Sequence, residues 1–421
     1  MHSQRLLMPL LPLAGAAALA AATAGNASAD AEWASRGGHV VIPNSSIEAP
    51  EHVGHRAHTN FKMFVPAGGA AARQTAPDAV PEASGPPFTG YLFETPASLA
   101  CVYRLVAPSV AGCNPNIATV NPNGGARAIA IVDAYHYPTA SSDLAVFSAQ
   151  FGLPRANLQV VFANGRQPSI DGEWNIEEAL DIEWAHAMAP NAKIYLVEAG
   201  TPSFANLMKA VSVAGELVAA AGGGEISMSW GGSEFPNQTS FDSYFNQVGV
   251  VYFAASGDSS GVIWPSTSLK VVAVGGTSIS RSPTTGAFQV ELAWQSGGGG
   301  SSLYEPRPGY QNAISAIVQD HRGTPDVAAD ADPSTGVWVY ASSNWYVVGG
   351  TSVAAPVWAG IVNAAGGFSP TSHGELVALY RSPGNTSDIV LGSCGPNQGN
   401  LASAGWDFCT GVGSPTGYSG K

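Results

Sequence analysis

The chain has 421 residues, enough for two or three average domains or for one large α/β domain. Only 11% of the residues are charged and 50 are glycine, and the mean hydropathy is +0.08, so the composition indicates a loop-rich globular protein and excludes a disordered one. The net charge of -13 argues against nucleic acid or an anionic membrane as a partner, and it suits an acidic medium in which most carboxylates are neutral.

The N-terminus has the pattern of an export signal. One arginine in "MHSQR" precedes an apolar run over 6–22, and "ASA" at 27–29 is typical of a cleavage site. A membrane span is the alternative, but the strongly apolar part is short and rich in alanine. We therefore predict a signal peptide over 1–29 and a secreted, extracellular protein that is not attached to a membrane after cleavage.

Export permits disulfide bonds, and the chain has four cysteines. Of the three possible pairings, the spacing favours Cys101 with Cys113 and Cys394 with Cys409. Neither pair has a histidine at metal-ligand spacing, which argues against zinc.

Residues 30–87 have little periodic apolar pattern and include "PAGGAAARQTAPDAVPEASGPP", so we interpret them as a short pro-segment or linker. Residues 88–421 form the predicted main domain. There, apolar strands alternate with helices, which predicts a mostly parallel central sheet with helices on both faces. The expected strands are 126–135, 158–163, 192–199, 225–230 and 250–256, and the expected helices are 143–152, 175–190 and 204–220.

In such sheets, ligands and catalytic groups lie beyond the carboxyl ends of the strands. Asp133 and Trp230 lie at the carboxyl ends of two of the predicted strands, and Asp258 follows a third. The alternative for each polar residue is a plain turn, since Asp and Gly are common there.

The helix over 175–190 carries two acids on an apolar face. Glu177 and Asp181 are four residues apart, and Leu180 and Trp184 fall on the same side. Glu178 and Glu183, pointing elsewhere, fit a solvated acidic stripe. Two buried carboxyls that interact have separated pKa values, so one can act as a base while the other supports it.

The stretch "GGTSVAAP" places Ser352 at the start of a small-residue helix, where backbone N–H groups favour a developing negative charge. A serine nucleophile needs a base. If Glu177 is that base, the chain is a serine hydrolase that works in acid.

The chain carries the motifs Glu-x-x-x-Asp, "ASGDSSG" and "GGTSVAAP" in this order. With these motifs it resembles the sedolisins, the serine-carboxyl peptidases, which have a subtilisin-like fold. The resemblance extends over about 91–415 through four further stretches, "SMSWGGSE", "WQSGGGGSS", "RGTPDVAADADPSTG" and "GWDFCTGVGSP". It implies a peptidase acting on peptides or proteins, either an endopeptidase or a tripeptidyl-peptidase. We expect a monomer.

The resemblance assigns roles to individual residues. Glu177 is implied as the general base, Asp181 as its supporting acid and Ser352 as the nucleophile. Asp258 is implied as the oxyanion partner, a role that requires a protonated carboxyl. Asp133 is a candidate further acid behind the pair. For Trp230 we expect a position in the substrate cleft, with a buried aromatic as the alternative.

The resemblance also implies a calcium site, built from two carboxylates and backbone carbonyls. The matching residues are Asp388, Ile389, Ser403, Gly405 and Asp407. Ser403 stands where the family usually has glycine, which matters if that position needs a positive φ. A capped turn closed by a disulfide is the alternative.

Two other functions remain open. A subtilisin-type Asp-His-Ser peptidase requires a histidine motif, and this sequence lacks one. His186 does not replace it, because it lies on the opposite side of its helix from Glu177. A secreted non-catalytic binding protein would not require the four polar residues. The predicted pro-segment is also much shorter than the folded pro-domain usual in sedolisins.

Overall fold

The computed structural model describes residues 38–66, 86–88, 91–107, 111–395 and 399–421. The predicted signal peptide and the 30–37 and 67–85 parts of the predicted pro-segment or linker lie outside these residues. No helix in the described part has the length and apolar character needed to cross a membrane.

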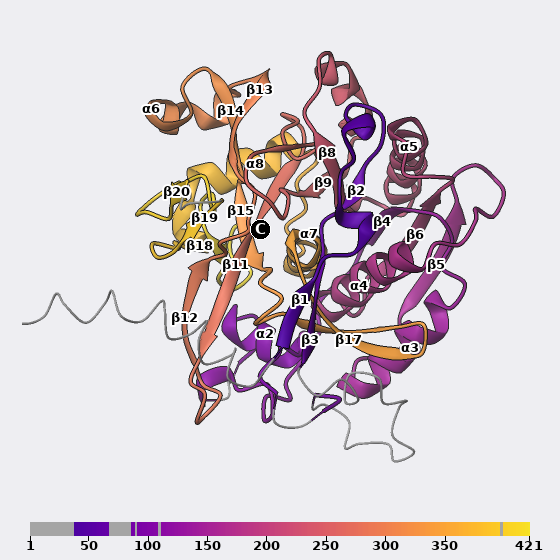
Figure 1. Cartoon of the computed structure of the whole chain (residues 1–421), viewed down its shortest axis with the longest axis vertical. Helices are drawn as coiled ribbons and strands as arrows, with labels where there is room; N and C mark the ends of the chain where they lie inside the picture. Colours follow the sequence, from indigo (N-terminus) through magenta and orange to yellow (C-terminus); the bar gives the residue numbers. More distant parts are fainter. Residues whose placement is uncertain (1–37, 67–85, 89–90, 108–110, 396–398) are drawn as a thin grey trace, which may run out of the picture.

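The described residues form a central sheet of eight strands, with the order β12-β11-β9-β7-β4-β6-β5 and with β15 paired to β11 (Figure 1). All neighbouring pairs are parallel except β11 and β12. The mostly parallel sheet is confirmed. The strands are β4 (Ala128–Ala134), β5 (Asn157–Phe162), β6 (Lys193–Ala199), β7 (Gly224–Met228), β9 (Val250–Ala255), β11 (Val272–Arg281), β12 (Phe288–Ala293) and β15 (Val327–Asp330).

Helices cover both faces of this sheet, as predicted. Along β4, Ile129 and Ile131 face one core, while Ala130 and Val132 face the other, which is the alternation that a strand buried on both sides requires. The first core contains residues of α4 (Gly172–Met188) and α7 (Thr351–Ala365), and the second contains residues of α5 (Phe204–Ala220). The other helices are α2 (Pro96–Val102), α3 (Ala140–Phe151), α6 (Ser315–Val318) and α8 (Ser372–Arg381).

Helix α4 is buried on every side. Asp171 caps it by accepting hydrogen bonds from the backbone N–H groups of Glu173 and Trp174. It then packs against α7, α3, β4 and β16 (Val337–Ala341). The prediction that Glu178 and Glu183 form a solvated stripe was wrong, since both have zero exposure. Glu183 accepts the backbone N–H of Tyr340, whereas the Glu178 carboxyl has no hydrogen-bond partner.

The stretch predicted as one strand over 225–230 is divided at Ser229 into β7 and β8 (Trp230–Ser233). In a separate small sheet, β8 lies between β10 (Ile263–Trp264) and β2 (His58–Thr59). The N-terminal stretch also supplies β1 (Gly38–Val41) and β3 (Lys62–Pro66), which join β17 (Asn344–Gly349) and β16 in a four-stranded sheet. The short remaining strands are β13 (Gly300–Pro306), β14 (His321–Thr324), β18 (Thr386–Ser387), β19 (Ser393–Cys394), β20 (Asn400–Leu401) and β21 (Ser414–Pro415).

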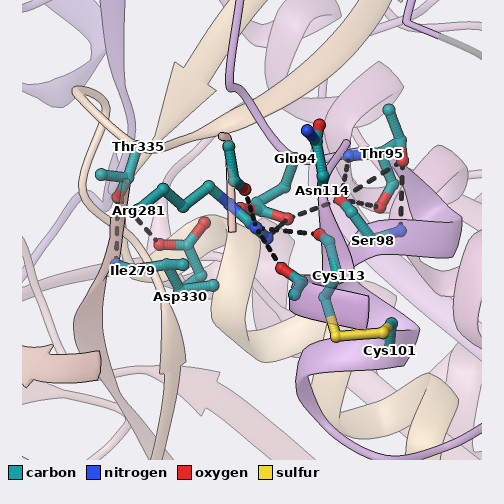
Figure 2. Close-up of polar contacts among 12 residues, drawn as sticks. Glu94, Thr95, Ser98, Cys101, Cys113, Asn114, Ile279, Arg281, Asp330 and Thr335 are labelled. Carbon is teal, nitrogen blue, oxygen red and sulfur yellow. Dashed lines mark hydrogen bonds and ion pairs between the residues drawn. A yellow bond between two sulfur atoms is a disulfide. The ribbon is translucent and has the colours of Figure 1, made fainter. Parts of the chain in front are cut away.

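Both predicted disulfides, Cys101–Cys113 and Cys394–Cys409, are present. Beside the first, a buried ion pair joins the segment before α2 to the end of β11 (Figure 2). The guanidinium of Arg281 contacts both carboxylate oxygens of Glu94, at 2.6 and 2.7 Å, and also donates to the backbone carbonyl of Cys113 at 2.8 Å. Both side chains are at most 1% exposed. Each charge is therefore satisfied only by the other and by nearby polar groups.

Removing one partner of this pair leaves an unpaired buried charge. We expect Arg281→Met to lower the free energy of unfolding by about 3–5 kcal/mol, measured by denaturant titration. Arg381→Met, at an exposed position at the end of α8, is the control and should change it by less than about 0.5 kcal/mol. If the two substitutions lower the free energy of unfolding equally, the ion pair does not hold the segment before α2 in place.

Candidate active site

Ser352 lies in the first turn of α7, directly after the turn that ends β17. The turn requires Gly350, which has a φ of +126°, a value that residues with a side chain rarely adopt. The hydroxyl of Ser352 donates to the backbone carbonyl of Ser229 at 3.0 Å and accepts the backbone N–H of Asn60 at 3.2 Å. Ser352 has zero exposure. The predicted nucleophile is thus placed at a helix N-terminus but is covered by the N-terminal segment.

Glu177 and Asp181 lie on α4, which packs against α7, and both have zero exposure. The hydroxyl of Ser229 donates to Asp181 Oδ1 at 2.8 Å, while its backbone carbonyl accepts the hydroxyl of Ser352, so Ser229 links Asp181 to Ser352. Neither Glu177 oxygen makes a hydrogen bond of normal length and angle. The predicted base, its supporting acid and the predicted nucleophile therefore converge, although they come from helices far apart in the sequence.

Burial raises the pKa of Glu177 well above its usual value, and the neighbouring carboxyls of Asp181 and Asp133 raise it further, whereas the interaction with the Ser352 hydroxyl opposes the rise. Burial and Asp133 likewise raise the pKa of Asp181, against the hydrogen bond from Ser229. Because no ion pair reaches either acid among the described residues, the pair lowers its energy by holding a proton.

Asp258 follows β9 and contacts the start of α7. Its Oδ1 accepts the backbone N–H of Thr351 at 2.7 Å and the Thr351 hydroxyl at 2.9 Å, while Oδ2 has no partner. Burial raises the pKa of Asp258 to about 6, against opposing effects of Lys62 and Thr351. In acid this carboxyl is protonated, and its free oxygen can then donate a hydrogen bond beside Ser352.

Asp133 is the penultimate residue of β4 and faces the α4 side of the sheet, in register with Glu198 on β6. Neither Asp133 oxygen has a hydrogen-bond partner, and burial, followed by Glu198, raises its pKa to about 8. Asp133 therefore lies among the site carboxyls. Trp230 is different: it has zero exposure and its indole donates to the carbonyl of Val132 at 2.7 Å, so the expectation that it lines a cleft was wrong and the buried-aromatic alternative holds.

His186 does not join the site. Its imidazole Nε2 contacts the carbonyl of Pro154 at 2.9 Å, and burial lowers its pKa to about 4. The structure therefore gives Ser352 a carboxyl neighbour and keeps this histidine on another side of α4.

Three contributors were missed from the sequence. Ser229 lies in "SMSWGG", and nothing in this sequence distinguishes it from a strand serine without a role in a site. Asn60 and Lys62 lie in the stretch interpreted as a pro-segment or linker, yet Lys62 Nζ donates to the carbonyl of Asp258 at 2.9 Å. No local pattern marks these residues, because their roles arise from strand pairing across the chain.

The two parts of the predicted calcium site lie side by side. The backbone N–H of Gly405 donates to Asp388 at 2.8 Å, and that of Ser403 donates to Asp407 at 2.9 Å. Gly405 has a φ of +85°, whereas Ser403 is not among the residues with positive φ, so serine is compatible with this backbone. The described residues contain no group of three or more His, Cys, Asp or Glu arranged to hold a metal. Calcium therefore stays a prediction.

Comparison with known proteins gives the family. No family model matches the chain. Kumamolisin from Bacillus sp. (strain MN-32) is 31% identical over 320 residues, which cover 66% of this chain and 56% of kumamolisin. Sedolisin from Pseudomonas sp. (strain 101) is 33% identical over 174 residues, which cover 38% of this chain and 29% of sedolisin. The chain belongs to the sedolisin family.

The solved structures support the fold. The structure of Pseudomonas sedolisin, a serine-carboxyl proteinase complexed with two molecules of pseudo-iodotyrostatin, matches with a TM-score of 0.65 at 23% identity, covering 77% of this chain and 95% of that one. Sphericase matches with a TM-score of 0.53 at 17% identity, covering 77% and 99%. The predicted subtilisin-like fold is confirmed. The chain spans about half or less of the length of the two sedolisin-family relatives named above.

Buried carboxyls with raised pKa values make the stability of this sedolisin-family chain depend on pH. Such groups bind protons more tightly in the folded state, so their stabilising contribution is complete below about pH 4 and is lost as the pH rises through the folded pKa. Burial raises the pKa of both Asp133 and Glu225 to about 8. We therefore expect the free energy of unfolding to fall between about pH 4 and 8.

Glu225→Gln should make this fall shallower by up to about 1.4 kcal/mol per pH unit, because the amide does not titrate. Glu216→Gln, at an exposed position on α5, is the control and should leave the slope unchanged. Chemical denaturation at several pH values measures both slopes. A wild-type stability that rises toward pH 8 would contradict the assignment.

Proposed function

We propose that the chain is a secreted serine-carboxyl peptidase that hydrolyses peptide bonds in acid. The observation that carries this proposal is the convergence of Ser352, at the start of α7, with a buried carboxyl pair on α4. Family membership supports it. Two disulfides and the N-terminal export pattern support action outside the cell.

The site residues divide the chemistry as follows. The Glu177–Asp181 pair holds one proton, and Asp181 carries it on Oδ2, the oxygen that Ser229 leaves free, so that Glu177 is ionised. Glu177 then accepts the proton of Ser352 as Oγ attacks the substrate carbonyl carbon, and later donates it to the leaving amine. Water repeats the two steps to release the acyl group.

Asp258 stabilises the negative oxygen that forms during attack. Because Thr351 occupies Oδ1, the proton of the neutral carboxyl resides on the unpartnered Oδ2, from which it can be donated to the oxyanion. The backbone N–H of Ser352, at the positive end of α7, is a second donor to the same oxygen. Both the base and the oxyanion donor therefore have the protonation states that catalysis needs at acidic pH.

These roles predict a bell-shaped dependence of kcat on pH. Activity should fall as the pH drops through ionisation of the Glu177–Asp181 pair. It should also fall as the pH rises through about 6, where Asp258 loses its proton. Asp258→Asn should retain partial activity and move the alkaline limb upward, because an amide donates at any pH. Asp258→Ala should lose about 10²–10³ in kcat.

Glu177→Gln should be inactive at every pH, since an amide does not accept the proton of Ser352. Steady-state hydrolysis of a denatured protein, measured on correctly folded variants, tests all three substitutions. Sequencing the products distinguishes internal cleavage from release of tripeptides. Full activity near pH 8, or cleavage by Glu177→Gln, would refute the carboxyl mechanism.

We also propose that Asp388, Ile389, Ser403, Gly405 and Asp407 bind calcium. Support comes from the backbone hydrogen bond of Gly405 to Asp388, which joins the two segments, and from that of Ser403 to Asp407 within the second segment. The carboxylates of Asp388 and Asp407, with the backbone carbonyls of the other three residues, supply the oxygen ligands that calcium prefers. Bound calcium would stabilise the C-terminal loops.

Removing calcium should lower the melting temperature, because a ligand that binds only the folded state stabilises it. Chelator should therefore lower the Tm of the wild type and leave that of Asp388→Asn nearly unchanged. Metal analysis of the purified protein provides an independent check. An unchanged wild-type Tm together with no bound metal would remove the site.

A further inference from the structure

Two glycines flank the reactive groups of the candidate site. Gly231 lies in β8, two residues after Ser229, whose backbone carbonyl accepts the hydroxyl of Ser352 at 3.0 Å. Gly257 directly precedes Asp258 and has a φ of +108°, a value that residues with a side chain rarely adopt. At both positions, only backbone atoms lie beside the groups that would act on a substrate carbonyl.

The side chain of Ile263 fills the space between these two glycines. A Cβ atom on Gly231 would lie 2.4 Å from Ile263 Cδ1, and a Cβ atom on Gly257 would lie 3.4 Å from the same atom. Ile263 is 8% exposed, so it reaches the surface but is covered almost completely. The isoleucine therefore occupies the gap that the absence of two side chains would otherwise leave open.

The chemistry of the site brings one substrate side chain to this gap. The carbonyl carbon under attack must lie about 3–3.5 Å from Ser352 Oγ, with its oxygen directed at Asp258. The residue that carries this carbonyl is the P1 residue, and standard bond lengths put its Cβ atom about 2.5 Å from the carbonyl carbon. The P1 side chain therefore lies beside the two segments that carry Ser229 and Asp258, where Ile263 fills the gap.

The segment of Gly257 is held from behind by main-chain contacts. The backbone N–H of Gly298 donates to the carbonyl of Gly257 at 2.8 Å, and the hydroxyl of Ser256 donates to the carbonyl of Gly298 at 2.8 Å. A Cβ atom on Gly298 would lie 2.5 Å from the carbonyl oxygen of Ser256, which shows how closely the two stretches pack. This wall of the gap therefore has little freedom to retreat from a larger side chain.

Ile263 is itself fixed in place. It pairs with Ser233 in β8, and its carbonyl accepts the hydroxyl of Ser266 at 2.7 Å. The next residue, Trp264, has zero exposure, and its ring packs edge-on against that of Phe204. Isoleucine is branched at Cβ, which restricts rotation about χ1. The paired backbone, the anchored neighbour and the stiff side chain together keep Ile263 in the gap.

We propose that Ile263 determines the P1 specificity of this peptidase and restricts cleavage to bonds that follow small residues, glycine and alanine. This inference rests on the proposed function of Ser352. Because protein interiors are close-packed, a larger P1 side chain could enter only the volume that the isoleucine already fills. One methylene group in an apolar pocket changes kcat/KM by about 10–200-fold, so the discrimination should be large.

The test uses the full chain and measures kcat/KM at about pH 4. The substrates are short peptides with a free amino terminus that differ only at the third residue, which is glycine, alanine, leucine or phenylalanine. Both an endopeptidase and a tripeptidyl-peptidase can cleave after that residue, and mass spectrometry identifies the bond cut. Ile263→Val and Ile263→Ala enlarge the gap in two steps. Val262→Ala, whose side chain lies beside Gly300, is the matched control. Circular dichroism shows which variants fold.

We expect the wild type and Val262→Ala to cleave after alanine at least about tenfold faster than after leucine or phenylalanine. Ile263→Ala should raise kcat/KM for leucine and phenylalanine at least about tenfold and change that for alanine by less than about threefold. A purely structural role would lower all four values together, so the ratio between substrates is decisive. If Ile263→Ala does not fold, an increase for leucine with Ile263→Val decides.

Two outcomes would overturn the inference and are distinguishable. A wild type that cleaves after leucine or phenylalanine as fast as after alanine, with ratios that the Ile263 variants leave unchanged, removes the specificity role but leaves the peptidase function intact. A wild type and folded variants that hydrolyse neither the four peptides nor a denatured protein remove the proposed function and the inference together.

Discussion

The burial of Glu177 and Asp181 between α4 and α7 is the constraint on which the rest of the site depends. Two carboxyls with zero exposure are costly as anions, and among the described residues neither has an ion-pair partner. Protonation relieves the cost, and Ser229 satisfies one oxygen of Asp181. In the proposed mechanism the two coupled carboxyls share one proton, so that Glu177 is the ionised member and can act as a base in acid, where a histidine would be charged.

The same constraint extends to the surrounding residues. Asp133 and Glu178 are also fully buried, and none of their carboxyl oxygens has a hydrogen-bond partner. By contrast, the buried guanidinium of Arg281 is paired with Glu94 at a distance from the catalytic helix. A carboxylate thus neutralises the buried charge of Arg281, whereas protonation neutralises the buried acids around α4.

The sequence predicted the central sheet and the main helices, because strand alternation and helical periodicity are local signals. The grouping of Glu177, Asp181, Asp258 and Ser352 in one site was implied by the resemblance to the sedolisins and not by these local signals. It did not predict the burial of Glu178 and Glu183, since a periodicity argument assigns a helix one buried face. Helix α4 has the sheet on one side and α3, α7 and β16 around the rest, so no face reaches solvent. The packing of a helix on all sides is a tertiary property.

The strands at 38–66 were missed for a related reason. The partner of β2 lies about 170 residues away in β8 and that of β3 about 280 residues away in β17, while β1 pairs with β3. Short strands of this kind are stabilised by their partners rather than by their own pattern. Asn60 shows the consequence, since an asparagine in a stretch without periodic pattern donates its backbone N–H to the hydroxyl of Ser352.

The most direct measurement is covalent trapping of the acyl-enzyme. The protein, mixed with a denatured substrate protein at about pH 4 and quenched during turnover, is digested and its peptides are mapped by mass spectrometry. The account predicts an ester-linked acyl fragment on Ser352 and on no other residue. Turnover without any adduct on Ser352, or an adduct on a different side chain, would contradict it.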